Sequence, residues 1–327
     1  MHLTNKDSFV FYKNPGDHNV NYIIGKWTNS QEIESSNSFI ITPFIGKTQE
    51  ISGNKGLLNI DILISNNETK NTNTFSKEQY IDQVEKYIKL CKNKSIDKIV
   101  LSRIVKIQNN IPNIFTIFKK LCKNYNHSFN YILNHPDYGM WMGASPEILI
   151  KGTGENFKTI ALAGSTKWNK NIKWREKEIE EQQYVKFYIE NILKSHTENL
   201  KCINDLETIK AGNIAHLSST FHFNINSSIY NLIKDLHPTP AVCGIPMKTT
   251  KELIINNEIH NRKLYTGFLG EINKDAISLY VNLRCMRINS NEFNIYVGGG
   301  ITAKSNPQEE WEETEIKAQT MLSLIEN

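Results

Sequence analysis

The order in which strands and helices are expected along this chain constrains its fold more than any other feature. Runs rich in β-branched residues predict strands at 98–107, 140–142, 146–151, 159–162, 277–288 and 293–297, after several short strands and loops within 1–75. Helical spacing of apolar residues predicts helices at about 76–91, 113–124, 175–195, 228–236, 249–256 and 307–325. Because the strands cluster before and after the helices instead of alternating strictly with them, the sequence favours an α+β fold with antiparallel sheet over a doubly wound fold.

Length and charge limit the class of protein. The 327 residues contain neither a short repeat nor a long flexible linker, so we expect one compact domain over 1–327. The net charge of +4 comes with scattered lysines, which excludes nucleic acid as the expected partner. No apolar run approaches the roughly 20 residues that cross a bilayer, and the N-terminus lacks the plan of a signal peptide, so we expect a cytoplasmic protein that does not bind membranes.

The five cysteines are widely spaced and mostly flanked by apolar residues. They predict reduced core thiols rather than metal ligands or nucleophiles: Cys91, Cys122, Cys202, Cys243 and Cys285.

The last expected helix carries acidic residues where a core face should be. It begins with Asn306 as cap and Pro307 at the first helical position, so its helical positions can be assigned. Its apolar face contains Trp311, Ala318, Met321, Leu322 and Ile325, and the opposite, solvated face contains Glu309, Glu312 and Glu315. Glu310, Glu313 and Lys317 lie along one border of the apolar face. A surface ion pair between Glu313 and Lys317, worth about 0.2 to 0.5 kcal/mol, is the simplest interpretation of that border.

A second helix, 174–193, also presents carboxylates inward. Its apolar stripe contains Tyr184, Val185, Tyr188, Ile189 and Ile192, with Glu181 in the middle of it and Glu178 one turn earlier. An ionised carboxylate in such a place costs several kcal/mol unless a cation or hydrogen-bond donors compensate it. A lysine would meet this need, but two helices that each present inward carboxylates also form the oxygen-only environment that suits Mg²⁺.

Donor groups near the C-terminus suggest an anionic ligand. The Gly298–Gly300 triplet follows an expected strand and could offer backbone N–H groups to an anion, although a glycine triplet is often only a turn. Arg284 is expected on the opposite face of its strand from Leu283 and Cys285, where a guanidinium suits bidentate binding of a carboxylate. These groups together with Mg²⁺ fit a small acid that has more than one carboxylate.

Several segments together resemble the chorismate-utilising enzymes, the family of isochorismate, salicylate, anthranilate and aminodeoxychorismate synthases. In order, they are DKIVLSR from Asp97, GASPE from Gly143, LAGS from Leu162, KEIEEQ from Lys177, HLSS from His216, LHPTPAVCG from Leu236, RKLYTG from Arg262, and GGGITAKSNPQEEWEETEIK from Gly298. The resemblance covers a catalytic segment, 76–325, and 1–75 is expected to be a shortened N-terminal part of the sheet. It implies two antiparallel sheets packed face to face with helices outside.

The resemblance also implies the roles of individual residues. Glu181 and Glu313 would bind Mg²⁺ directly, and Glu310 mainly through water. Arg284, Tyr265, Lys317 and the Gly298 amide would hold substrate carboxylates, and Gly164, Ser165, His216 and Ala241 would line the pocket. The chain departs from the family pattern at Ile179 and Gln182 beside the metal glutamate, and at Lys167, so the contacts around the ligands are expected to differ from the family pattern.

The residues nearest the attacked ring carbons discriminate between reactions. A lysine at the place of Lys98 is the general base in the water-using members, isochorismate and salicylate synthases. The aminodeoxychorismate branch has a nucleophilic lysine where this chain has Ala163. The resemblance therefore implies an isochorismate synthase, in which Lys98 activates water and Glu147 is the general acid, with no glutamine amidotransferase subunit and a monomeric or weakly dimeric state.

Two alternatives follow from the same residues. Salicylate synthases use the same lysine and glutamate and then eliminate pyruvate. A catalytically silent relative could act as a binding protein, although the intact set of Lys98, Glu147, Glu181 and Glu313 argues against that. The expected product would feed either menaquinone or siderophore biosynthesis.

Overall fold

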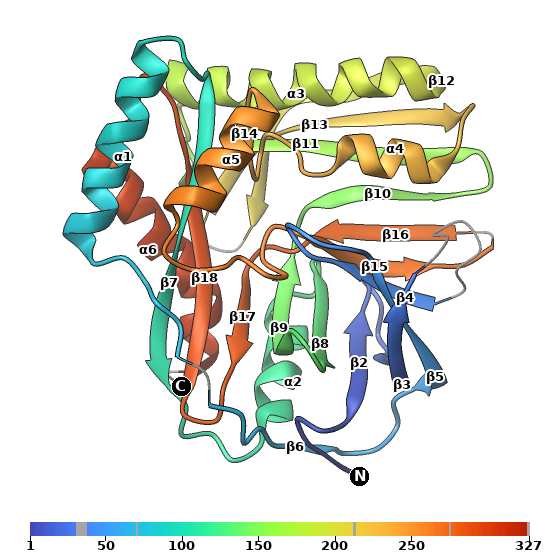
Figure 1. The fold of residues 1–327 in the computed structure, drawn as a ribbon. Coiled ribbons are helices and arrows are strands. Elements are labelled where there is room, and N and C mark those ends of the chain that lie inside the picture. Colours follow the sequence, from blue (N-terminus) through green and yellow to red (C-terminus); the bar gives the residue numbers. More distant parts are fainter. Residues whose placement is uncertain (31–37, 70, 212–213, 275, 326–327) are drawn as a thin grey trace.

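The computed structural model describes residues 1–30, 38–69, 71–211, 214–274 and 276–325. The described helices are α1 (Lys77–Lys92), α2 (Ile114–Asn124), α3 (Glu176–His196), α4 (Ile229–Leu236), α5 (Met247–Asn257) and α6 (Pro307–Ile325) (Figure 1). The strands are β1 (His2–Leu3), β2 (Ser8–Lys13), β3 (Asn21–Asn29), β4 (Ser38–Thr42), β5 (Gln49–Leu57), β6 (Leu63–Ile64), β7 (Lys98–Gln108), β8 (Phe129–His135), β9 (Gly139–Ser145), β10 (Ile148–Thr153), β11 (Asn156–Lys167), β12 (Thr197–Ala211), β13 (Ile214–Ile225), β14 (Gly244–Ile245), β15 (Phe268–Ile272), β16 (Ala276–Val281), β17 (Cys285–Ile288) and β18 (Glu292–Ile301).

One large antiparallel sheet organises the molecule. Within the described residues its 16 strands follow the order β12-β13-β11-β10-β16-β15-β4-β5-β3-β2-β8-β9-β17-β18-β7-β14, and β1 and β6 form a separate parallel pair. Strands β13, β11, β10, β16 and β15 run across Figure 1, whereas β7, β18, β17, β9, β8 and β2 run nearly at right angles to them. The expected two sheets are therefore two halves of one hydrogen-bonded sheet, because β4 pairs with β15 of one half and with β5 of the other.

The two halves pack face to face over an apolar and aromatic core. Phe129 of β8 stacks on Tyr280 of β16 with ring centroids 4.5 Å apart, so strands from opposite halves touch directly. Tyr12 of β2 lies 5.0 Å from Phe39 of β4 in the same core. The predicted α+β class with face-to-face packing is confirmed.

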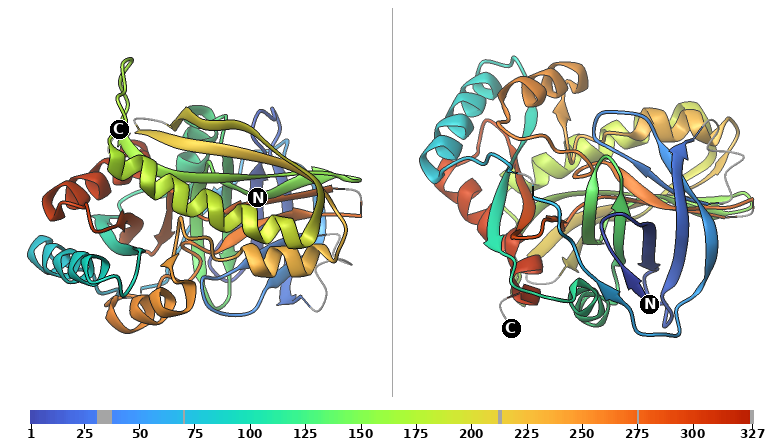
Figure 2. Two further views of the ribbon diagram at one scale, coloured as in Figure 1. Left: turned by 90° about the horizontal axis from the view of Figure 1, so that it is seen from above. Right: turned by 60° about the horizontal axis from the view of Figure 1, so that its bottom comes forward.

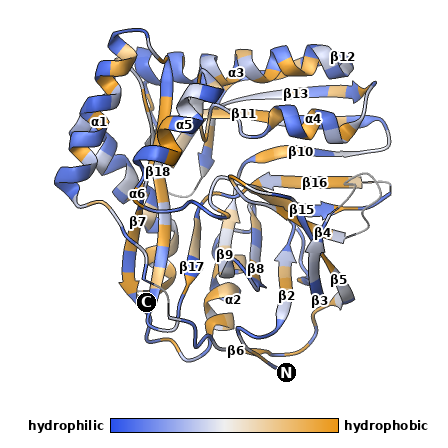
Figure 3. Cartoon of the chain, viewed as in Figure 1, coloured by the Kyte–Doolittle hydropathy of each residue, from blue (hydrophilic) through white to orange (hydrophobic). Residues whose placement is uncertain are grey.

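Helices cover the outer faces of both halves. Helices α3 and α4 lie side by side over β10, β11 and β13 (Figure 2), where Val185 and Ile189 pack on Phe221. Helices α2 and α6 cover the outer face of the other half, with α1 and α5 against β7. Hydrophilic and hydrophobic residues alternate along α1 and α3, whereas β16 and β18 are largely hydrophobic (Figure 3). No helix in the described ranges is long and apolar enough to cross a membrane.

Local capping groups fix where α1 and α6 begin, and the cap expected at Asn306 is confirmed. Ser76 and Gln79 form a capping box at α1. The Asn306 side chain accepts hydrogen bonds from the backbone N–H groups of Gln308 and Glu309, which fixes the first turn of α6. The position of every α6 carboxylate follows from this cap.

Three sequence-based expectations were wrong. The strand expected at 277–288 is two strands, β16 and β17, and Arg284 lies in the break between them with φ of +48°, not on a strand face. The glycine triplet lies inside β18 instead of following it. Cys202 is exposed on β12, whereas the other four cysteines are buried free thiols. The long hairpin of β12 and β13 was not predicted, since β12 is polar and mostly exposed.

Candidate active site

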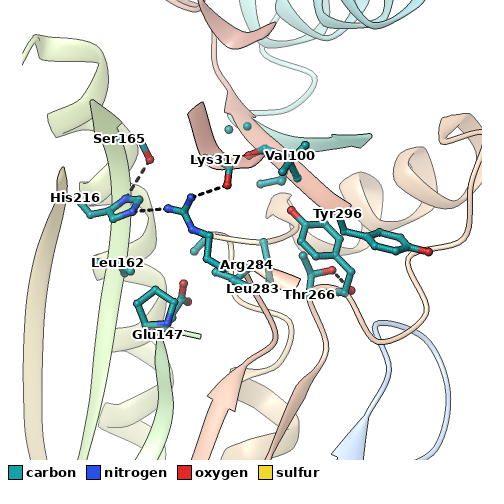
Figure 4. Close-up of a pocket in the computed structure, with 18 of the residues that line it drawn as sticks. Val100, Glu147, Leu162, Ser165, His216, Thr266, Leu283, Arg284, Tyr296 and Lys317 are labelled. Carbon is teal, nitrogen blue, oxygen red and sulfur yellow. Dashed lines mark hydrogen bonds between the residues drawn. The ribbon is translucent and has the colours of Figure 1, made fainter. Parts of the chain in front are cut away.

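A pocket of about 670 Å³ lies where β11, β13 and α3 of one half of the sheet meet β7, β18 and α6 of the other. Among the residues that line it are nine of those predicted for the site: Glu147, Ser165, Glu181, His216, Ala241, Tyr265, Arg284, Gly298 and Lys317. Figure 4 shows that they come from elements far apart in the sequence. The fold therefore brings these predicted residues together.

A hydrogen-bond relay fixes one side of the pocket. The Arg284 guanidinium donates to Nε2 of His216 at 3.1 Å, and Nδ1 of His216 lies 3.1 Å from Oγ of Ser165 and 3.3 Å from the Gly164 carbonyl oxygen (Figure 4). Because arginine cannot accept a hydrogen bond, Nε2 is the acceptor and Nδ1 carries the proton. Burial, together with Arg284 and Lys317, lowers the pKa of His216 to about 3. The ring is therefore neutral and holds the guanidinium in place.

Gly164 shapes the same side through its backbone. It has φ of +67° and sits at a register shift between Ala163 and Ser165, where β11 pairs with β13. A Cβ atom there would lie 2.8 Å from the Glu178 carbonyl oxygen of α3. Glycine thus permits both the β-bulge that turns Ser165 toward His216 and the close approach of α3.

Glu147 is a buried carboxyl group in the pocket, at 3% exposure. Burial raises its pKa to about 8, although Lys98 and Lys317 act in the opposite direction. At neutral pH this group is mostly protonated and can donate a proton, which is the protonation state that a general acid needs. Tyr265 is also buried, and burial raises the pKa of its phenol, so it remains a hydrogen-bond donor toward the pocket.

Lys98 is the first residue of β7 and is 1% exposed. Its Nζ lies 3.0 Å from Oε1 of Glu181. The nearest charged partner of Lys98 is therefore a carboxylate. Glu181 is buried on α3, as its position within the apolar stripe predicted, and the ion pair is what compensates it.

The glycine triplet gives these charged groups room beside the sheet. A Cβ on Gly300 would lie 2.2 Å from Oε1 of Glu181 and 2.9 Å from Cε of Lys98, and one on Gly299 would lie 3.0 Å from Oε2 of Glu310. On one side, Gly298–Gly300 pair with β7. On the other side, the described pairing of β17 with β18 ends at Tyr296, so this edge of the glycine triplet is left facing the site. The Gly298 carbonyl oxygen accepts a hydrogen bond from Lys317 there, at 2.9 Å.

The other two predicted metal ligands are paired with lysines. Glu313 lies 2.5 Å from Lys317, which is the ion pair expected from their spacing, and Glu310 lies 2.5 Å from Lys177. We call the set of Glu181, Glu310, Glu313, Lys98, Lys177 and Lys317 the lysine–carboxylate cluster. Lys177 had no predicted role, although its position four residues before Glu181 on one helix places the two side chains on the same face.

The cluster fits a divalent cation in part. Oε2 of Glu310 is buried and has no hydrogen-bond partner among the described residues, and burial raises the pKa of this carboxyl against the opposing Lys177 charge. Such an oxygen is available to a cation. Within the described ranges, however, no three His, Cys, Asp or Glu side chains are already arranged around one point, since each carboxylate is turned toward its lysine. The ligand type suits Mg²⁺, but ligand geometry would require the lysines to move.

A second buried ionic group, which the sequence analysis did not predict, lies behind the pocket. Both oxygens of Glu258 accept from Arg262, at 2.6 and 2.8 Å, and the backbone N–H and hydroxyl of Ser102 donate to Oε1. The remaining Arg262 donors reach the carbonyl oxygens of Val100 and Val242 and the hydroxyl of Thr266. We call Glu258, Arg262 and Ser102 the arginine–glutamate network. It ties together three separate segments that line the pocket.

Comparison with known proteins agrees with this fold. Residues 48–326 match the family described as chorismate binding enzyme. The chain belongs to the chorismate binding enzyme family. Isochorismate synthase EntC of Escherichia coli (strain K12) is 29% identical over 244 residues, which are 70% of this chain and 62% of that relative.

Two solved structures share the architecture. One is described as a 2,3-dihydroxybenzoate-specific isochorismate synthase, DhbC, from Bacillus anthracis; it has a TM-score of 0.83 and 25% identity, over 98% of this chain and 96% of that one. The menaquinone-specific isochorismate synthase MenF from Escherichia coli has a TM-score of 0.82 and 18% identity, over 98% and 88% of the two chains.

Proposed function

We propose that this protein is an isochorismate synthase that converts chorismate to isochorismate with Mg²⁺. The observation that carries the proposal is a pair of buried groups. Glu147 lines the pocket, and its raised pKa of about 8 keeps it mostly protonated; Lys98, at the start of β7, is paired with the lining residue Glu181. A base and an acid in the same site are what an exchange of hydroxyl groups across a ring requires. The relatives described as isochorismate synthases support the same reaction.

The proposed reaction balances as an isomerisation. Lys98, in its neutral form, takes a proton from water while the water oxygen bonds to C2 of chorismate. The ring double bonds shift, the bond between C4 and its hydroxyl oxygen breaks, and Glu147 gives its proton to that oxygen, which leaves as water. Lys98 can act only after it has lost its proton and left its ion pair with Glu181, so substrate binding must disturb the lysine–carboxylate cluster.

The rest of the pocket would bind the two carboxylates of chorismate. Arg284 is oriented by His216, and Tyr265 and Lys317 offer further donors, so the anionic substrate would meet a site rich in positive charge and N–H or O–H groups. Glu181, Glu310 and Glu313 would hold Mg²⁺. That ion would supply positive charge to neutralise a substrate carboxylate.

Product analysis of the purified chain with chorismate and Mg²⁺, in the absence of ammonia, tests this function. We expect isochorismate to form, and to stop forming when a chelator removes Mg²⁺. Release of pyruvate with fluorescent salicylate would instead identify a salicylate synthase. No consumption of chorismate would leave a binding protein. Because we propose that the chain works without a glutamine amidotransferase subunit, its activity should not depend on ammonia. We also propose that the protein acts as a monomer or weak dimer.

Lys98→Ala and Glu147→Gln test the two catalytic assignments. Each should lower kcat by about 10²- to 10⁴-fold, because each removes one proton transfer. Lys106→Ala, on the same strand, and Glu155→Gln, on the surface, are matched controls that should keep full activity, and circular dichroism should show all four variants folded. Turnover by either catalytic variant at near the parent rate would refute that assignment.

The pathway that uses the product is a further proposal. Relatives with similar sequence include a vibriobactin-specific isochorismate synthase of Vibrio cholerae, and MenF is described as menaquinone-specific. We propose that this chain supplies isochorismate to either siderophore or menaquinone biosynthesis.

A further inference from the structure

Lys177 is the buried charged residue of the lysine–carboxylate cluster that the proposed reaction does not use. It extends from the first turn of α3, and its Nζ lies 2.5 Å from Oε1 of Glu310. Its side chain is 10% exposed and that of Glu310 is 1% exposed, so this is a desolvated ion pair. A buried pair of this kind is costly to break unless another charge replaces the missing partner.

The Lys177 ammonium acts on all three proposed metal ligands. The negative charges of Glu310, Glu313 and Glu181 together raise its pKa, even though burial alone would lower it. Lys98, Lys177 and Lys317 each form an ion pair with one member of the set, Lys177 with Glu310. Lys177 therefore touches one of the three carboxylates and acts on the other two through their charge, as a nearby cation would.

The structure also provides a place for Lys177 to go. A second pocket, of about 690 Å³, opens beside the cluster, and Lys177 and Glu313 line it together with Glu309 and Glu312 of α6. Glu309 and Glu312 are exposed. We call this pocket the side chamber. A lysine side chain is flexible enough to turn from Glu310 into the chamber, where it would meet Glu312 and water. Lys167 and Arg175 line the same chamber, and Arg175 is paired with Glu309.

We propose that Lys177 is an internal counter-ion that neutralises the carboxylates in the metal-free protein and that a divalent cation displaces it into the side chamber. This inference rests on the proposed metal ligands. It is consistent with the buried Oε2 of Glu310 that has no partner among the described residues, because the Lys177 ammonium contacts only Oε1 of that carboxylate. It also means that metal binding is an exchange of cations, in which the cost of moving Lys177 lowers the metal affinity.

Lys177→Met should have opposite effects on the metal-free and the Mg²⁺-bound protein. The metal-free variant should unfold about 5 to 10 °C lower than the parent, because Glu310 loses its partner while it remains buried. Titration calorimetry should show that the variant binds Mg²⁺ at least about tenfold more tightly, since no ammonium competes for the carboxylates. Saturating Mg²⁺ should therefore raise its melting temperature more than that of the parent. Lys173→Met removes the same charge from an exposed position just before α3 and should change neither quantity.

Amine acetylation of the parent protein provides a test that does not depend on the variant folding. Peptide mass spectrometry should show Lys177 protected in the metal-free protein and more reactive with Mg²⁺, while Lys173 reacts equally in both. Two results would refute the proposed exchange of cations but not the proposed metal site. One is that Lys177→Met binds Mg²⁺ no more tightly than the parent. The other is that Mg²⁺ leaves the protection of Lys177 from acetylation unchanged. If calorimetry detects no Mg²⁺ binding to the parent or the variant, the proposed metal site fails, and the exchange fails with it.

Discussion

Two buried ionic groups lie on either side of one pocket, and they differ in how completely their charges are satisfied. In the arginine–glutamate network, all five N–H groups of Arg262 are used, and both oxygens of Glu258 accept hydrogen bonds. In the lysine–carboxylate cluster, each carboxylate has a lysine, and one oxygen of Glu310 has no partner among the described residues. The first arrangement suits a permanent structure, and the second suits groups that exchange partners.

The pKa values of the carboxyl groups differ between the two ionic groups in the same way. Burial would raise the pKa of Glu258, but Arg262 outweighs it and lowers that pKa, so the carboxylate stays ionised. Burial prevails at Glu310, whose pKa is raised despite Lys177. The difference teaches that burial alone does not distinguish structural from functional carboxylates in this protein; the number of donors that reach each oxygen does.

The largest expected effect comes from breaking the satisfied network. Arg262→Met should lower the free energy of unfolding by about 3–5 kcal/mol, because it leaves the Glu258 carboxylate buried without its cation. Chemical denaturation with urea measures this loss. Glu310→Gln in the other group should cost less than Arg262→Met, because the charges of Glu313 and Glu181 still act on Lys177 after its partner is removed. Equal losses in the two variants would contradict the comparison.

The next effect concerns the space around the lysine–carboxylate cluster. Gly300→Ala should lower kcat/KM by about 10²-fold, because the new methyl group must push Glu181 and Lys98 out of place and small displacements of catalytic groups are costly. Both atoms that it meets are near the ends of flexible side chains, so the protein should still fold. Steady-state assays would measure the loss. Gly56→Ala, on an exposed part of β5, is the control, and a fully active Gly300→Ala enzyme would show that the close approach is unimportant.

The effect of pH on Glu147 is smaller. Its folded pKa of about 8 lies above the ordinary 4.5, so its contribution to stability is fully present below pH 4.5 and is lost as the pH rises through 8. Replacement by Gln should remove this pH dependence and stabilise the protein at pH 7 by on the order of 2 kcal/mol. Denaturation at several pH values tests it.

The same titration of Glu147 should also limit the catalytic rate. Because the proposed acid must be protonated, kcat of the parent should fall as the pH rises above about 8. A rate that stays constant up to pH 10 would contradict the assignment of Glu147 as general acid.

The smallest effect comes from an ion pair that is exposed. Lys119 of α2 lies 2.9 Å from Asp61, and both side chains are more than half exposed. Lys119→Ala should change the free energy of unfolding by less than about 1 kcal/mol, since water screens the pair. A loss as large as that of Arg262→Met would mean that pairing, rather than burial with complete hydrogen bonding, decides the cost.

Local signals in the sequence predicted the helices and the inward carboxylates. The caps at Ser76 and Asn306 depend on neighbouring residues only, and the burial of Glu181 follows from helical spacing. The break before β17 could not be predicted, because apolar residues continue on both sides of Arg284 and the break depends on tertiary contacts with His216. The pocket residues on β11 and β13 were found only through the family resemblance.

The ionic partners were the least predictable part of the site. Lys98 and Glu181 are 83 positions apart in the sequence, and only the fold brings them to 3.0 Å. Arg262 lies within a segment that the resemblance includes, but the sequence gives no sign that its five donors join three lining segments.

The left-handed backbone at Arg284 has a consequence for how this position can vary. Glycine and asparagine accept a φ of +48° most readily, but neither carries the guanidinium that meets His216 and the pocket. Lysine keeps the positive charge, but it loses the planar fork and does not relieve the backbone. None of these single substitutions therefore meets both requirements, the guanidinium and the left-handed backbone. A saturation library should find residue 284 intolerant even to the replacements that are usually considered conservative.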